Sequence, residues 1–192
     1  MIRILCYGDS NTWGYISNVN GYKKDAVIKQ YQGEFMIPKF INITEKQLVL
    51  FDMDGVLAEY VAGEEINIIN EVPNTYLNKR PIKSVIKVAE QLHKMQNITV
   101  GILSSCDHAS QVIEKKKWLQ KYLPYIDDDN IYIVVWTNES YTKETRCRAK
   151  LDQIQKISGY NDIFLIEDTH KNISTTNQTI QNCAHHVSEL LD

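Results

Sequence analysis

Four short apolar runs alternate with helix-like patterns along most of this chain, and that alternation restricts the fold more than any other feature. Strands joined through helices form βαβ units, which build a parallel sheet with right-handed crossovers. We therefore predict an α/β fold with a parallel sheet. The expected strands are residues 47–51, 98–103, 131–136 and 162–166, and the expected helices are residues 81–92, 109–122 and 150–157.

The first apolar run leads directly into Asp52-Met53-Asp54-Gly55. Side chains alternate in direction along a strand, so Asp52 and Asp54 point the same way, and the carbonyl of Asp54 stays available. Two carboxylates held close together repel each other unless a cation lies between them or one keeps its proton. A strand end followed by an Asx turn has the same pattern, but the pair also suits a hard metal ion, a nucleophile and an acid/base group.

Polar side chains also follow two of the later runs. Ser104 and Ser105 come after the second run, and Glu167 and Asp168 come after the fourth. Because parallel strands end at one edge of a sheet, where such sheets bind ligands, we expect these side chains beside the two aspartates. Carboxylates around one crevice demand a divalent cation, and all-oxygen ligation favours Mg²⁺ over Zn²⁺. The Ser104 hydroxyl and the loop amides after it could hold phosphate oxygens.

Composition excludes several other classes of protein. The 192-residue chain is 43% hydrophobic with a formal net charge of -3, which gives no argument for nucleic-acid or anionic-membrane binding. Its four cysteines are scattered, which predicts free thiols rather than disulfides or a zinc framework. No apolar run approaches the about 18 residues of a membrane helix, and no signal-peptide core is apparent. We therefore expect a cytoplasmic protein.

The expected helix at residues 109–122 contains a basic run, Lys115-Lys116-Lys117, which we interpret as part of a solvated face. Its apolar positions Val112, Ile113 and Leu119 are expected to face the core.

Two stretches lack a clear pattern. Residues 58–80 are too many for a simple turn, and we expect them to form a small flap over the strand ends. The tail from Asn172 onward is polar and shows only a weak helical pattern at residues 186–191.

As a set, the motifs resemble those of haloacid dehalogenase (HAD) superfamily hydrolases. Residues 51–57 match the first motif, residues 101–104 the second, and residues 164–168 with Asn172 the fourth. The resemblance implies a HAD-like Rossmannoid three-layer sandwich with a parallel sheet and a minimal cap. Residues 114–119 and 162–172 most resemble a small-cap, 5′-nucleotidase-like branch.

The resemblance also implies a role for each site residue. Asp52 would be the nucleophile, Asp54 the general acid/base, and Ser104 the residue that binds the transferring phosphoryl group, with Ser105 beside it. The implied Mg²⁺ ligands are Asp52, Asp54, Glu167 and Asp168.

The third motif of the family is a lysine, and two lysines fit it. Lys150 lies 18 residues before Asp168, the spacing expected for a lysine at the foot of the preceding helix. Lys143 lies closer to the end of the third strand and suits a helix that begins near Thr142. We favour Lys150 as a catalytic and substrate-binding residue, and expect the other lysine at the surface.

The implied activity is a magnesium-dependent phosphatase that forms an aspartyl-phosphate on Asp52. Superfamily members that cleave carbon–halogen or carbon–phosphorus bonds lack the second aspartate, so Asp54 indicates phosphate esters. The leading substrate is a small phosphorylated molecule, such as a nucleoside monophosphate. An open crevice also leaves room for a phosphorylated nucleic-acid end, or for closure by a second subunit. The alternative is a non-catalytic HAD-like binding module.

A rival motif lies at the N-terminus. Residues 2–14 resemble the first block of SGNH (GDSL-type) esterases, in which Ser10 would be the nucleophile. The family's Asp-x-x-His pair and Gly-x-Asn-Asp block are missing, so a serine esterase is the less favoured function. We predict that residues 1–45 form an extension resembling a truncated esterase, and that residues 46–192 form the phosphatase domain.

Overall fold

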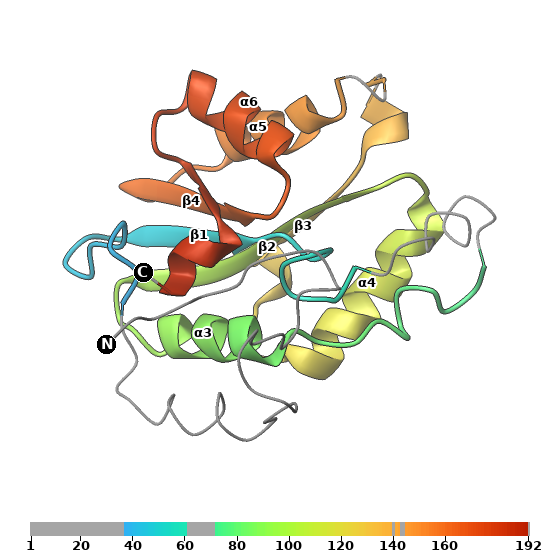
Figure 1. Cartoon of the computed structure of the whole chain (residues 1–192), viewed down its shortest axis with the longest axis horizontal. Coiled ribbons are helices and arrows are strands. Elements are labelled where there is room, and N and C mark those ends of the chain that lie inside the picture. Colours follow the sequence, from blue (N-terminus) through green and yellow to red (C-terminus); the bar gives the residue numbers. More distant parts are fainter. Residues whose placement is uncertain (1–36, 61–71, 140, 143–144, 192) are drawn as a thin grey trace, which may run out of the picture. The chain divides into compact units, whose positions relative to one another are not determined.

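The structure is a computed structural model that describes residues 37–60, 72–139, 141–142 and 145–191. All of these belong to the unit Ile37–Asp192, which is built on a parallel sheet of order β3-β2-β1-β4-β5 (Figure 1). The strands are β1 (Gln47–Phe51), β2 (Ile98–Cys106), β3 (Ile131–Val135), β4 (Asp162–Glu167) and β5 (Ala184–His186).

The central strand is β1, and all five of its residues are buried. It pairs with β2 and β4 in a register that sets Phe51 beside both Ile102 and Ile166. A Cβ on Gly101 of β2 would lie 2.7 Å from the main-chain oxygen of Asn130, so the glycine of the second motif allows a close backbone approach. Because β1 is central and fully buried, it is covered on both faces, and its last residues lie at the middle of the sheet edge.

Helices cover both faces of the sheet. Figure 1 shows α3 (Lys83–His93) and α4 (Ala109–Tyr122) on one face, and α5 (Cys147–Lys156) and α6 (His170–Thr179) on the other. Short 3₁₀ helices, η2 (Asp128–Asn130), η3 (Trp136–Glu139) and η4 (Val187–Leu191), complete the described elements. The predicted α/β Rossmann-like sandwich with a parallel sheet is confirmed.

The structure moves two predicted boundaries that matter for the site. Strand β2 continues to Cys106, so Ser104 and Ser105 lie within the strand rather than in a loop after it. The polar tail contains most of α6 and the edge strand β5, which pairs Ala184 with Leu165 of β4. Sequence patterns missed β5 because it is only three residues long.

The inward face of α4 differs from the predicted one. Its buried residues are Gln111, Lys115, Trp118 and Leu119, whereas the Ile113 side chain is 58% exposed. The placement of Lys115 on a solvated face and of Ile113 in the core is therefore wrong. A period of 3.6 residues allows either face, and a carboxylate supplied by another element decides between them, as the site shows.

The segment between β1 and α3 is described at residues 58–60 and 72–82, where it forms turns and two isolated bridges, Asp54–Ala58 and Ala58–Pro81. The minimal cap expected here also involves residues 61–71, which lie outside the described residues. Among the residues that the structure describes, no helix is both long and apolar enough to span a membrane.

Candidate active site at the carboxyl edge of the sheet

Three carboxylates from neighbouring strands meet where the chain leaves the sheet. Asp52 follows β1, Glu167 ends β4, and Asp168 comes next. One oxygen from each lies within 4.8 Å of the others, and these three form the one such acidic group among the described residues. The sheet thus brings together groups separated by more than a hundred positions in the sequence, as its parallel topology requires.

Asp52 is buried but only half paired. Its Oδ2 lies 2.7 Å from Nζ of Lys150, while its buried Oδ1 has no hydrogen-bond partner. Burial raises the pKa of Asp52 to about 6, against the opposing pull of Lys150. A buried carboxylate oxygen without a partner is costly, and a divalent cation bound there would remove that cost. The residues present therefore fit a cation held by oxygen ligands.

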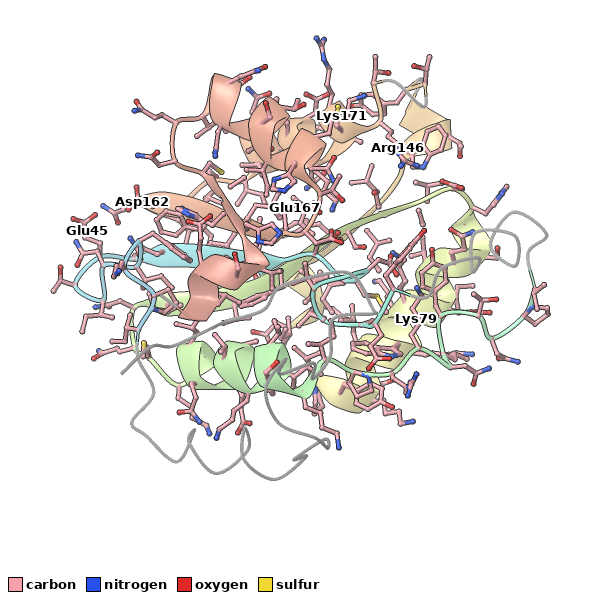
Figure 2. All side chains as sticks on the ribbon, in the orientation of Figure 1. Glu45, Lys79, Arg146, Asp162, Glu167 and Lys171 are labelled. Carbon is pink, nitrogen blue, oxygen red and sulfur yellow. The ribbon has the colours of Figure 1, made fainter. Side chains whose placement is uncertain are left out.

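Both carboxylate oxygens of Glu167, which Figure 2 labels, accept hydrogen bonds from other groups of the protein. Its Oε1 accepts the backbone N–H groups of Asp168 and Thr169, each at 3.1 Å. Its Oε2 accepts Nζ of Lys150 at 2.6 Å and the amide of Asn172 at 3.0 Å. Glu167 thereby fixes both the lysine and the turn that presents Asp168. Burial raises the pKa of the Asp168 carboxyl.

Gly55 permits the two strand ends to approach. Its φ is +77°, in the left-handed region, and a Cβ built on it would lie 2.0 Å from Oδ2 of Asp168. A side chain at this position would occupy the space that the Asp168 carboxylate fills.

Lys150 reaches the crevice. It projects from α5 and bridges Asp52 and Glu167 while almost fully buried. Burial disfavours its charge, but the two carboxylates outweigh burial and raise the pKa of Lys150. The other candidate, Lys143, lies outside the described residues.

Asp54 faces a different set of partners. Its Oδ2 lies 2.5 Å from Nζ of Lys115 on α4, and its Oδ1 lies 3.0 Å from Nζ of Lys79 in the segment before α3. Burial acts to raise the pKa of Asp54, but the two lysines outweigh it and hold the pKa below its usual value. Its carboxylate therefore lies apart from the acidic cluster, in two ion pairs.

Ser104 is joined to the same group. Its Oγ accepts a hydrogen bond from Nζ of Lys115 at 2.8 Å, and the main-chain oxygen of Ser105 accepts another at 3.0 Å. Ser104 is buried and Ser105 is half-buried at the strand edge. Cys106, next along β2, is not a thiolate nucleophile at neutral pH, because burial raises its pKa to about 11.

Lys79 and Lys115 are site residues that the sequence reading missed. One signal for Lys115 was present: it lies four residues after Gln111 and three before Trp118, on a single helical face. No sequence pattern in the segment around Lys79 distinguishes this lysine from its neighbours. Ser10 lies outside the described residues, so the hypothesis of a serine esterase remains a prediction.

No family model and no curated protein matches the chain. Among solved structures, it is similar to a chain in the Pnkp1/Rnl/Hen1 RNA repair complex, with a TM-score of 0.57 and 20% identity over 76% of this chain and 43% of that chain. A second Pnkp1/Rnl/Hen1 structure gives a TM-score of 0.56 and 19% identity over 76% and 47% of the two chains. Our chain thus spans less than half the length of these relatives.

A third similar structure is the HAD domain of the effector protein Lem4 from Legionella pneumophila. The TM-score is 0.45, with 11% identity over 73% of this chain and 84% of that chain. At 20% identity and below, the likenesses to the repair-complex chains concern the fold alone.

Proposed function

We propose that the protein is a magnesium-dependent phosphomonoester hydrolase of the HAD type. The observation that carries this proposal is the group formed by the buried Asp52 and Glu167 and the half-buried Asp168. One Asp52 oxygen in it has no hydrogen-bond partner, and the other is paired with Lys150. Phosphoryl transfer through an aspartate requires a nucleophilic carboxylate paired with a positive charge, together with a cation site and a lysine at the same edge of the sheet. The motif resemblance at residues 51–57, 101–104 and 164–172 supports the same reaction.

Asp52 and Asp168 would hold the metal, and we assign Glu167 to positioning because its oxygens already serve Lys150, Asn172 and two backbone amides. When bound, Mg²⁺ would neutralise charge on the phosphoryl oxygens and on the carboxylates around them. Lys150 adds a fixed positive charge to the same place, and the Ser104 hydroxyl would contact a phosphoryl oxygen. The ligand role expected of Asp54 would fall to its carbonyl, since its carboxylate is in ion pairs.

The reaction proceeds in two displacements. An Asp52 oxygen attacks phosphorus and the bond to the leaving oxygen breaks. That oxygen takes its proton from the protonated form of Asp54, which is the minor form because Lys115 and Lys79 outweigh burial and lower the pKa of this carboxyl. Asp54, now ionised, takes a proton from a water molecule as the water oxygen attacks the aspartyl-phosphate. The bond between Asp52 and phosphorus then breaks, releasing inorganic phosphate and restoring the Asp52 carboxylate and the Asp54 acid.

Nucleoside monophosphates are the substrate class that we propose to test first, following the motif resemblance. A phosphorylated nucleic-acid end is the second class that we propose, and the fold shared with a chain of an RNA repair complex makes RNA the nucleic acid to test. Neither class is favoured by a global positive charge, since the chain's formal net charge is -3.

The test is hydrolysis of an aryl phosphate and an aryl acetate, each with Mg²⁺ and with EDTA, by the wild type, Asp52→Asn and Ser10→Ala. We expect Mg²⁺-dependent phosphate release that Asp52→Asn abolishes and Ser10→Ala retains. Acetate cleavage that ignores EDTA and disappears in Ser10→Ala would instead establish the esterase. A panel of nucleoside monophosphates and 3′- or 5′-phosphorylated RNA then separates the substrate classes by kcat/KM.

A further inference from the structure

Two buried lysines from different elements hold the Asp54 carboxylate. Lys115 projects from α4 and Lys79 from the segment before α3, and neither side chain is exposed to solvent. Each pairs with a different oxygen of Asp54, so rotation of the carboxylate would break at least one ion pair. Lys115 also donates to Ser104, so one side chain contacts two groups of the proposed site.

Helix α4 fixes the segment that supplies Lys79. The Glu114 carboxylate accepts the backbone N–H groups of Asn74 at 2.6 Å and Tyr76 at 3.0 Å. One turn further, the buried indole N–H of Trp118 donates to the carbonyl of Lys79 at 2.9 Å. Glu114 and Trp118 therefore anchor the segment, and Figure 2 shows Lys79 beside α4.

The Tyr76 ring completes this arrangement. Its centroid lies 4.6 Å from Nζ of Lys115 and 5.3 Å from Nζ of Lys79. An aromatic face attracts an ammonium group and limits where it can move. Both cations are thus positioned by a ring as well as by the carboxylate that they share.

Stability alone is a weak reason for this arrangement. Removing two ammonium groups and a carboxylate from water costs several kcal/mol per ion, and apolar replacements for such groups are often neutral or stabilising. A proton-transfer group, however, gains from a fixed orientation, because catalysis requires it within hydrogen-bond reach of the reacting oxygen.

We propose that Lys79 and Lys115 are positioning residues that orient the Asp54 carboxylate for proton transfer and keep it out of the metal cluster. This inference rests on the proposed phosphatase function and assigns to α4 and the 72–80 segment a role within it. Ser104 is aligned with Asp54 through the shared contact to Lys115.

The two displacements respond differently to the loss of this orientation. With an activated ester such as dinitrophenyl phosphate, the leaving group departs without needing a proton, so formation of the aspartyl-phosphate depends little on Asp54. Hydrolysis of that intermediate still requires Asp54 to take a proton from water. A variant with a misplaced Asp54 therefore accumulates aspartyl-phosphate.

The experiment is pre-steady-state hydrolysis of dinitrophenyl phosphate by Lys115→Met and Lys79→Met, with Lys116→Met as the matched control on the exposed face of the same helix. We expect kcat to fall about 10- to 100-fold in the first two variants, which is a partial loss of the roughly 100- to 10,000-fold that acid–base catalysis contributes. Their kcat/KM should stay within about threefold of the wild type. A dinitrophenolate burst near one equivalent should appear in them, and Lys116→Met should match the wild type.

Loss of kcat and kcat/KM together without a burst, or no change in either, would overturn the proposal. Thermal unfolding of each variant shows whether it is folded, and Lys79→Met decides the question if Lys115→Met is not, because it leaves Lys115 on Asp54. A wild type with no Mg²⁺-dependent turnover would overturn the phosphatase function, and with it this inference. An active wild type with unresponsive variants would overturn the inference alone.

Discussion

Asp52 and Asp54 stand one residue apart at the end of β1, yet their surroundings shift their acidity in opposite directions. Burial dominates at Asp52 and raises its pKa to about 6, whereas Lys115 and Lys79 outweigh burial at Asp54 and lower its pKa. In sites with two carboxylates of separated pKa, the general acid has the raised value. Asp54 has the lowered value, so its ionised carboxylate is suited to taking a proton from water in the second displacement.

The raised pKa of Asp52 predicts a pH effect on the metal-free protein. Because the folded-state pKa of about 6 exceeds the usual aspartate value of 3.8, the folded protein binds this proton more tightly than the unfolded chain. The free energy of unfolding should therefore fall as pH rises from about 4 to about 6, by at most about 3 kcal/mol from this group. Urea unfolding in EDTA at pH 4.5 and pH 7 measures the change.

Asp52→Asn is the control, since it removes the titrating group and keeps the shape. Its free energy of unfolding should decline less over the same pH interval than that of the wild type. Saturating Mg²⁺ should reduce this difference in pH dependence between the two proteins. Identical pH dependence in both proteins would contradict the assignment to Asp52.

Gly55 and Gly159 give a second prediction, because both have positive φ but different surroundings. A Cβ on Gly55 would meet Asp168 at 2.0 Å, whereas a Cβ on Gly159 has nothing within 4 Å. Gly159→Ala should cost only the backbone strain, about 1–2 kcal/mol. Gly55→Ala should cost that and also displace Asp168, lowering Mg²⁺ affinity about 10-fold or more. Titration calorimetry with Mg²⁺ compares the two variants, and equal affinities would exclude the predicted displacement.

The rotation of helix α4 about its axis is set by polar groups that neighbouring segments supply. Its inward face carries Lys115 beside Trp118, and it turns Ile113 toward solvent. An apolar side chain is exposed here because the opposite arrangement would leave Asp54 without Lys115 and the Lys79 carbonyl without the Trp118 indole.

Substitutions on the two faces of α4 test this orientation. Trp118→Ala should lower the free energy of unfolding by about 3–5 kcal/mol, since it removes a fully buried side chain and a buried hydrogen bond. Ile113→Ala should change it by less than about 0.5 kcal/mol, as for other surface positions. Urea denaturation measures both, and the reverse order would restore the face expected from the sequence.

The described unit as a whole begins at Ile37. Phe40 stacks on His185 of β5 with ring centroids 3.9 Å apart, and meets the Phe164 ring of β4 edge-on at 5.3 Å. Ile41 is buried beside it in sequence. Residues before β1 thus pack against the far edge of the sheet, within the stretch that the sequence reading assigned to the extension.

Two truncations follow from this packing. We expect a chain that starts at Ile37 to keep the fold and any phosphatase activity. A chain that starts at Ile43 loses Phe40 and Ile41 and should be less stable by about 2–4 kcal/mol. Thermal unfolding and aryl phosphate hydrolysis compare the two, and equal stability would show that Phe40 contributes nothing to the sheet edge.

Much of this architecture could be predicted from local patterns. β1 and α4 begin and end where the sequence indicates. These succeed because a buried parallel strand needs a continuous apolar run and a helix needs a 3.6-residue period, both of which are properties of adjacent residues. Strand β5 lacks such a run, and its place at the sheet edge comes from pairing with β4.

The amino-acid sequence thus accounts for the class of fold and for which carboxylates follow which strands. The division of labour between those carboxylates was decided in three dimensions. Lys150 forms an ion pair with Asp52, while Lys79 and Lys115 form ion pairs with Asp54. Charge on a buried group is stable only where an opposite charge is within a few ångströms, and such proximity is produced by packing distant segments together, which no local pattern records.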